Sequence, residues 1–222
     1  MLKKKIKFFK PNLILSKKLA IIGSSASILK KKNGNKIDQY DEIIRFNNSK
    51  IENYEEYVGS KTTTRVVNNP TFECAPMWDY VDEDRYFVKN LRNINIAVIS
   101  PYKIDSRFKE ENCSDKNNYF FLENKYFQYL TIFYFFKNLS IIFNMIKIFF
   151  GKKNFSIGFY TIVLSIISGI KPTLFGFDLN EDMNNRSHYW EKPGKVGNRH
   201  NLSLEHKIIY QFINEGFINL VD

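Results

Sequence analysis

The chain has 222 residues, the size of one ordinary domain, and is 44% hydrophobic and 25% charged, as foldable globular proteins are. Its 33 Lys and Arg residues outnumber its 23 Asp and Glu residues, and the net charge of +10 indicates anionic partners: nucleotides, nucleic acid, acidic sugars or a membrane surface. Two cysteines, Cys74 and Cys113, exclude a disulfide-stapled secreted scaffold and favour a reducing compartment.

Residues 1–18 form a basic arm with only short apolar runs. A signal peptide needs an uninterrupted apolar stretch of roughly 7–15 residues, so none is predicted here. A solvated arm is one interpretation, and electrostatic attachment to an anionic membrane leaflet is the alternative. Residues 19–222 are predicted to form a single domain, because no repeat or low-complexity linker divides them.

Short apolar runs alternate with longer helical patterns along the domain. This alternation predicts an α/β fold, a Rossmann-like domain with a mostly parallel sheet covered by helices on both faces. In such sheets ligands bind beyond the carboxyl ends of the strands, here near residues 23–25, where small hydroxyl residues also favour a helix start. The predicted strands are residues 19–23, 42–46, 64–67, 94–100 and 173–177, and the predicted helices are residues 156–170 and 202–212.

An aromatic stretch over residues 126–150 is long enough to suggest a membrane span. Lys137 and Lys147 interrupt it, however, and each costs roughly 2.5–3.5 kcal/mol at the centre of a membrane helix. A helical segment packed on the core, or covering an acceptor site near lipid, is therefore the preferred interpretation.

Common cofactor motifs are absent. Residues 23–27 do not fit the dinucleotide-binding pattern, and residues 59–62 lack the glycines that a phosphate loop requires before them. Asp82 and Asp84 could hold a divalent ion against a nucleotide diphosphate, but they lie in a charged run that favours a solvated turn. No metal-type cysteine cluster is present, so no metal site is predicted.

Two of the three histidines, His188 and His200, follow the last predicted strand in a loop rich in Gly and Pro. A loop at that edge of the sheet is where catalytic groups belong. A near-neutral imidazole can remove a proton from a hydroxyl, and a second imidazole can stabilise a departing phosphate. Glu191 and Glu205 are the candidate supporting carboxylates, either of which could fix one ring in its tautomer.

Four segments in this order resemble the sialyl motifs of the sialyltransferases of glycosyltransferase family 29. Residues 19–70 are similar to the large motif, with its D-x-[IV]-x-R-x-N step at residues 41–47 and its V-G-x-[KR]-T-[ST] ending at residues 58–63. Residues 155–178 resemble the small motif. His188-Tyr189-Trp190-Glu191 looks like the third motif, and His200-x-x-x-x-Glu205 like the very small one.

The resemblance implies a GT-A-like sialyltransferase fold and an inverting transfer of sialic acid from CMP-sialic acid to a sugar hydroxyl of a glycan or glycolipid. It implies no cofactor and no metal, since CMP carries a single phosphate. His200 would then be the general base, and His188 would hydrogen-bond the phosphate. The donor pocket would be lined by Gly23, Ser24, Asn47, Ser156, Gly158, Gly176, Tyr189 and Trp190.

Each of these residues also has a purely structural interpretation. Asn47 can serve only to cap a turn, and Gly158 only to allow close packing of a helix. Tyr189 and Trp190 are as often core aromatics as pocket walls.

Bacterial sialyltransferases of family 42 are a second resemblance, through Gly176-Phe177-Asp178, Ser187-His188-Tyr189 and a later histidine. The chain departs from family 29 where Ser24 replaces the usual Asn, which puts one donor contact in doubt. Neither motif segment contains the cysteine that the family uses for its disulfide. This departure fits a cytoplasmic enzyme, with peripheral membrane contact through the arm and residues 126–150.

Four other functions remain as alternatives. The same fold could use another CMP-sugar, such as CMP-Kdo, because the motifs recognise cytidine and phosphate more clearly than the sugar. A metal-dependent UDP-sugar transferase would use Asp82 and Asp84. Nucleic-acid binding is disfavoured, because the aromatic residues cluster in an apolar run instead of following a basic stripe. An inactive relative is the fourth alternative, because Ser24 departs from the pattern.

Overall fold

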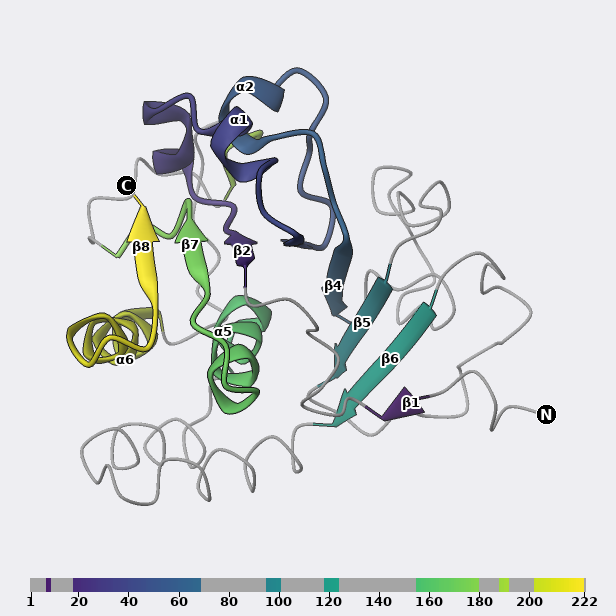
Figure 1. The fold of residues 1–222 in the computed structure, drawn as a ribbon, viewed down its shortest axis with the longest axis vertical. Coiled ribbons are helices and arrows are strands. Elements are labelled where there is room, and N and C mark those ends of the chain that lie inside the picture. Colours follow the sequence, from purple (N-terminus) through teal and green to yellow (C-terminus); the bar gives the residue numbers. More distant parts are fainter. Residues whose placement is uncertain are drawn as a thin grey trace.

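The computed structural model of the chain describes residues 7–8, 18–68, 95–100, 118–123, 155–179, 188–191 and 202–221. These ranges contain both strands and helices (Figure 1). In chain order the elements are β1 (Lys7–Phe8), β2 (Leu19–Ile22), the 3₁₀ helix η3 (Ala26–Lys30), α1 (Gly34–Ile37), β3 (Glu42–Phe46), α2 (Glu55–Val58), β4 (Thr64–Asn68), β5 (Asn95–Ser100), β6 (Asn118–Glu123), α5 (Ile157–Ile167), β7 (Thr173–Phe175), α6 (Leu202–Asn214) and β8 (Asn219–Val221).

The strands form one eight-stranded sheet in the order β1-β6-β5-β4-β3-β2-β7-β8. All of its described pairings are parallel, which confirms the predicted α/β class and parallel sheet. All five predicted strands are present, although β7 ends at Phe175, two residues earlier than expected. The chain turns there because Gly176 has a φ of 67°, in the left-handed region that glycine tolerates best. Strands β1, β6 and β8 were not predicted, and β1 lies within the basic arm.

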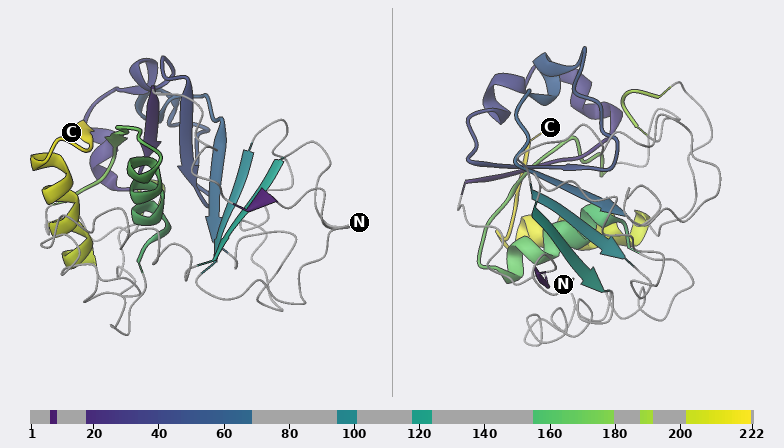
Figure 2. Two further views of the ribbon diagram at one scale, coloured as in Figure 1. Left: turned by 60° about the horizontal axis from the view of Figure 1, so that its bottom comes forward. Right: turned by 90° about the vertical axis from the view of Figure 1, so that its right-hand side faces the viewer.

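Side chains of the central strands alternate between two separate cores. Leu19 and Ile21 of β2 belong to the cluster that contains the buried faces of α5 and α6. Ala20 and Ile22 belong to the second cluster, which includes residues of η3, α1 and α2. Figure 2 shows these two groups of helices on opposite sides of the central strands. The sheet is therefore covered on both faces, as the apolar character of its strands predicts.

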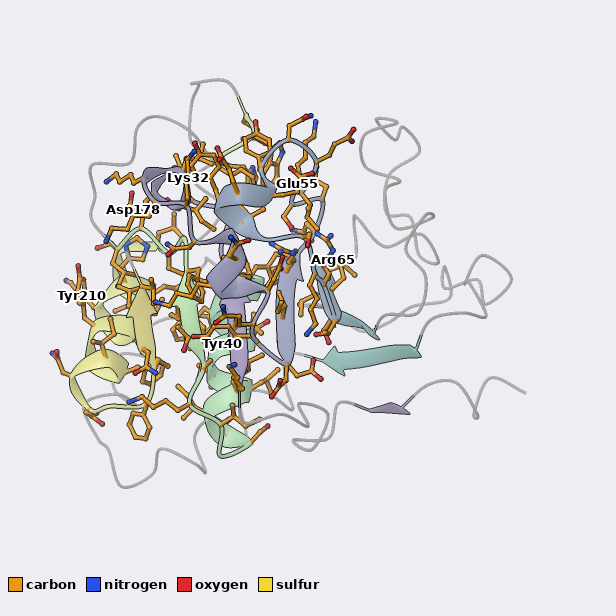
Figure 3. The ribbon with its side chains drawn as sticks, turned by 45° about the horizontal axis from the view of Figure 1, so that its top comes forward. Lys32, Tyr40, Glu55, Arg65, Asp178 and Tyr210 are labelled. Carbon is orange, nitrogen blue, oxygen red and sulfur yellow. The ribbon has the colours of Figure 1, made fainter. Side chains whose placement is uncertain are left out.

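Helix α5 lies deep in the structure, and α6 lies at its surface. Residues 158–166 of α5 are buried without interruption, so the helix has no polar face. It ends where Gly169, with a φ of 74°, closes the last turn and Ile170 donates its N–H to the carbonyl of Ser165. In α6 the buried residues recur at helical spacing, while Tyr210 on the outer side is 42% exposed (Figure 3).

The order of the strands identifies the edge where a ligand is expected. From β2 the chain proceeds through β3, β4, β5 and β6 on one side, then returns to place β7 on the other side of β2. The order therefore reverses between β2 and β7. In open parallel sheets ligands bind beyond the carboxyl ends of the strands at such a reversal. The loops that follow β2 and β7 consequently define the candidate site.

Candidate active site

The loops after β2 and β7 approach each other closely through two glycines. Ile22 pairs with Phe175, so Gly23 and Gly176 follow at neighbouring positions. The N–H of Gly23 donates to the carbonyl of Phe175 at 2.7 Å, and a Cβ added at Gly23 would lie only 2.3 Å from the Gly176 oxygen. Any side chain at Gly23 would therefore separate the two loops. Gly23 and Gly176, which were predicted as site residues, must therefore be glycine for structural reasons.

The loop after β2 continues into the predicted helix start. Ser25 caps η3 through its side chain, which accepts from the Ser27 N–H at 3.4 Å, and its own N–H donates to the Gly176 carbonyl at 3.1 Å. Ser24 lies half-buried between these contacts. Its carbonyl accepts the N–H of Tyr189 at 2.9 Å, which brings the third motif to this loop.

The N-terminus of α5 lies at the same edge of the sheet, because a crossover helix runs opposite to its parallel strands. Ser156 caps the helix by accepting the Phe159 N–H at 3.2 Å. Gly158 lies in the first turn, where a Cβ would approach the Phe177 ring to 3.4 Å. Phe177 directly follows Gly176, so Ser156 and Gly158 lie beside the loop after β7. A helix start at this place favours an anion.

Glu205 of α6 anchors that helix start. One carboxylate oxygen accepts the Ser156 N–H at 2.7 Å and the other accepts its hydroxyl at 2.6 Å. The side chain is 2% exposed, and burial raises its pKa to about 7, although the bonds from Ser156 counteract part of that effect. We expected Glu205 to support an imidazole. Its described hydrogen bonds instead hold Ser156, the N-cap of α5.

Residues 188–191 place the third motif beside the loop after β2. Nδ1 of His188 lies 2.7 Å from a carboxylate oxygen of Glu191, within ion-pair distance, although the two groups are not aligned for a hydrogen bond. The imidazole stacks on Trp190 with ring centroids 4.6 Å apart and planes 17° from parallel. His188 and Trp190 are both half-buried, so the stacked pair lies at the surface of the site.

Tyr189 differs from its neighbours, because its side chain is 1% exposed and belongs to the second core. Its hydroxyl donates to the carbonyl of Lys50, and its ring packs edge-on against Tyr54 at 5.1 Å. Burial raises the pKa of the phenol to about 12 despite the opposing fields of two arginines. The structure thus corrects the expectation that Tyr189 lines the pocket: the ring is a core aromatic, which was the structural alternative.

Asn47 follows β3 at the position that corresponds to Ser24 after β2, since Ile22 pairs with Arg45. It adopts a left-handed conformation with a φ of 39°, which Asn tolerates better than most residues. Its N–H donates to the carbonyl of Val66 at 2.9 Å. Asn47 is thus a turn residue, and it also lies half-buried at the candidate edge.

Two buried arginines, which sequence reasoning did not select, hold the loops at this edge. Arg45 and Arg65 are direct partners on β3 and β4, and Arg65 is labelled in Figure 3. Arg65 donates to the carbonyls of Asn47 and Ser49 at 3.1 and 3.2 Å and to the Ser49 hydroxyl at 2.6 Å. Burial lowers the pKa of Arg65 to about 9 and that of Arg45 to about 10, so both remain cationic at neutral pH. A charged residue inside an apolar strand was the available sequence signal.

Arg45 organises the loop that follows α2. It donates to the carbonyl of Val58 at 2.6 Å, of Gly59 at 3.1 Å and of Lys61 at 3.0 Å. From the other side the Asp38 carboxylate accepts the N–H groups of Ser60 and Lys61. This loop ends the large motif, so its V-G-x-[KR]-T-[ST] residues have a structural role.

Several predicted features lie outside the described residues. They are His200, the Asp82 and Asp84 pair, both cysteines, most of the basic arm and the aromatic stretch at residues 126–150. In the described part of the chain no cluster of three or more His, Cys, Asp or Glu side chains could hold a metal ion. No helix among the described residues has the length and apolar character that crossing a membrane requires.

Comparison with curated proteins finds strong similarity over a short part of the chain. Sialyltransferase-like protein 2 of Arabidopsis thaliana is 49% identical over 66 residues, which are 30% of this chain and 15% of that protein. Beta-galactoside alpha-2,6-sialyltransferase 2 of Xenopus tropicalis is 42% identical over 67 residues, 30% of this chain and 13% of that protein. The matches therefore span well under two thirds of these relatives.

Solved structures share the fold over almost the whole chain. A mammalian sialyltransferase, solved with Gal-beta-1-3GalNAc-ortho-nitrophenol, superposes with a TM-score of 0.60 and 17% identity, covering 96% of this chain and 71% of that one. CstII of Campylobacter jejuni, solved with cytidine-5'-monophosphate, gives a TM-score of 0.50 and 15% identity, covering 91% and 78%. Both predicted resemblances are confirmed at the level of the fold.

The profile of one family matches nearly the whole length of the chain. That match runs over residues 10–217 and includes all four motif segments. The chain therefore belongs to glycosyltransferase family 29 (sialyltransferase).

Proposed function

We propose that this protein transfers sialic acid from CMP-sialic acid to a sugar hydroxyl of a glycan or glycolipid, with inversion at the anomeric carbon. Membership of family 29 supports the reaction class. The observation that carries the proposal is the convergence, where the strand order reverses, of Gly23, Gly176 and the start of α5.

The sugar nucleotide is proposed to bind along the loops after β2 and β3 and the start of α5. The first turn of α5 has N–H groups without intrahelical partners, and its dipole favours an anion such as the CMP phosphate. Gly158 would let the phosphate approach the backbone. Ser24 and Asn47, at corresponding positions on neighbouring strands, would contact the nucleotide, and Trp190 would form a wall of the pocket.

His188 is proposed to hydrogen-bond the phosphate through Nε2, while Glu191 holds the Nδ1 side of the ring. A donor fixed there stabilises the negative charge that develops as the bond between the anomeric carbon and the phosphate breaks. His200 is proposed as the general base that removes the proton of the acceptor hydroxyl. Because CMP carries one phosphate, the proposed reaction requires no metal ion to bridge two.

Nucleotide binding tests the proposal without knowledge of the acceptor. Calorimetry should show CMP binding more tightly than UMP or GMP, with the same affinity in EDTA. A preference for UMP that requires a divalent ion would instead support the UDP-sugar alternative, and folded protein that binds no nucleotide would overturn the proposal.

Transfer assays then identify the sugar. CMP-sialic acid is expected to be consumed and CMP-Kdo is not; the reverse result would establish the other CMP-sugar. His200→Ala and His188→Ala should each lower kcat by about 10²-fold or more. His206→Ala is the matched control, since it removes the remaining histidine, on α6. Equal activity of all three variants would contradict the assigned roles.

Peripheral membrane association is proposed for the basic arm and residues 126–150, with the protein on the cytoplasmic face. The net charge of +10 supports attraction to anionic lipid. Co-sedimentation with phosphatidylserine vesicles at low salt should exceed that with phosphatidylcholine vesicles, and equal sedimentation would contradict the proposal.

A further inference from the structure

Tyr189 makes all the described backbone and side-chain hydrogen bonds that connect the 188–191 segment to the rest of the protein. Its N–H donates to the carbonyl of Ser24 at 2.9 Å, and its hydroxyl donates to the carbonyl of Lys50. His188 and Glu191 bond within the segment, through the contact between their side chains and a backbone bond from Glu191 to His188. The place of the His188 ring therefore depends on the residue that follows it.

The two carbonyls that Tyr189 contacts lie at the two loops that the proposed donor site uses. Ser24 belongs to the loop after β2, and Lys50 directly follows the turn after β3, which the bond from the Ser49 N–H to the Phe46 carbonyl closes. Arg65 holds the Asn47 turn from the interior through its bonds to Asn47 and Ser49. Arg65 therefore holds this turn on its buried side, and the Tyr189 hydroxyl binds the carbonyl of Lys50 beside it.

The ring of Tyr189 is fixed as firmly as its polar ends. It is 1% exposed, and it packs edge-on against Tyr54 at 5.1 Å and against Trp190 at 4.6 Å. Trp190 in turn stacks on the His188 imidazole. A continuous path of contacts therefore runs from the buried phenol through Trp190 to the imidazole.

We propose that Tyr189 is a positioning residue, which holds His188 at a fixed place relative to the turns after β2 and β3 through its bonds to Ser24 and Lys50. The inference rests on the role proposed above for His188 in the reaction, but the placement itself can be measured without that role. Tyr189 does not contact the substrate in this proposal. It acts by joining the third motif to the large motif.

Tyr189→Phe is the direct test, because it keeps the ring and removes only the hydroxyl that binds Lys50. Tyr54→Phe is the matched control, since Tyr54 is the ring partner of Tyr189 and its hydroxyl has no described hydrogen bond. The chain has only three histidines, so NMR of ¹⁵N-histidine-labelled protein resolves His188, assigned by loss of its signal in His188→Ala. We expect the His188 ring signal to shift or broaden in Tyr189→Phe and to stay unchanged in Tyr54→Phe.

Activity supplies the second readout. Tyr189→Phe should lower kcat by about tenfold to a hundredfold, as small misplacements of catalytic groups do, while the Kd for CMP changes less than about threefold. In a His188→Ala background the same substitution should have no further effect on kcat. An unchanged His188 signal, or full additivity in the double variant, would overturn the proposal. If wild-type protein shows no transfer, the proposed function fails and the NMR result still decides the placement.

Hydrogen exchange of the wild-type protein tests the placement without any variant, so the test remains possible if Tyr189→Phe does not fold. The Tyr189 amide should exchange at least about a hundredfold more slowly than an unprotected amide, because it is bonded to a buried frame. Exchange at the rate of an unstructured peptide would show that the segment is not held there, and would overturn the proposal directly.

Discussion

The carboxyl group of Glu205 should make the stability of the protein depend on pH in a direction opposite to that of ordinary surface carboxylates. Its pKa is about 7 in the folded protein, against an ordinary value of 4.5, because burial disfavours the charged form more than the two bonds from Ser156 favour it. The folded state therefore binds a proton between these two values that the unfolded state has released. The stabilisation is fully present below pH 4.5 and is lost as the pH rises through about 7.

The size of the effect follows from the difference between the two pKa values. A displacement from 4.5 to about 7 corresponds to roughly 3 kcal/mol of unfolding free energy between pH 4.5 and pH 8. Glu205→Gln removes the titration while keeping the shape of the neutral side chain. Its amide can accept the Ser156 N–H and donate to the Ser156 hydroxyl oxygen, so the contact with α5 is retained.

Urea unfolding of wild type and Glu205→Gln at several pH values between 4.5 and 8 gives the unfolding free energy of each protein. The difference between the two is the contribution of Glu205 titration. Other carboxylates titrate equally in the two proteins, so subtraction isolates Glu205. The stability of Glu205→Gln relative to wild type should increase by about 3 kcal/mol from the lowest pH to the highest. A difference that stays constant across this range would refute the reasoning, since it would show that Glu205 does not titrate there.

Three further predictions concern packing and hydrogen bonding. Gly23→Ala should destabilise the protein by about 2 kcal/mol or more in thermal unfolding, because its Cβ would lie 2.3 Å from the Gly176 oxygen. In Gly158→Ala the new Cβ would lie 3.4 Å from the Phe177 ring. That variant should therefore keep or gain stability, but it should bind CMP more weakly. An equal loss of stability in both would show that Gly158 serves packing alone. Arg45→Met should cost about 3 kcal/mol or more in urea unfolding, because it leaves buried carbonyls unsatisfied, whereas Lys30→Met, an exposed loss of the same charge, should cost less than about 0.5 kcal/mol. Asp38 is partly desolvated, which opposes the shift, but hydrogen bonds from Ser60 and Lys61 and the field of Arg45 hold its pKa below 3.8. Asp38→Asn should therefore cost about 1 kcal/mol at pH 7, and the cost should shrink as the pH falls through the folded pKa; a cost that does not change with pH would contradict this assignment.

The central strands could be predicted because their burial on both faces imposes a local pattern. Runs such as those at residues 19–22 and 42–46 are apolar for lack of a solvated face, and the sequence displays that directly. Strands β1 and β8 have two and three residues. Segments this short have no detectable period, and they are strands only because β6 and β7 offer them a partner.

In the candidate site, too, contacts between residues close in the chain could be predicted, and contacts between distant residues could not. Ser25 caps the helix that begins next to it, as the small hydroxyl residues of that loop predicted. The helix that Ser156 caps was predicted from the apolar run that follows it. The partner of Glu205 is Ser156, far away in the chain, and no local pattern encodes that contact. Tyr189 was expected at the pocket wall because residues 188–191 resemble the third sialyl motif. Only the fold shows that its side chain turns into the core while His188 turns out.

The position of β7 beside β2 has a consequence for how the protein acquires activity during synthesis. β2 is made long before the residues that complete its carboxyl edge, Gly176 among them. Until then the open side of β2 is an unpaired strand edge, which is prone to association with other chains. Closing so large a loop is entropically costly and tends to make folding slow. A ribosome-bound chain truncated before residue 170 should therefore be unable to bind nucleotide, however well its large motif has folded.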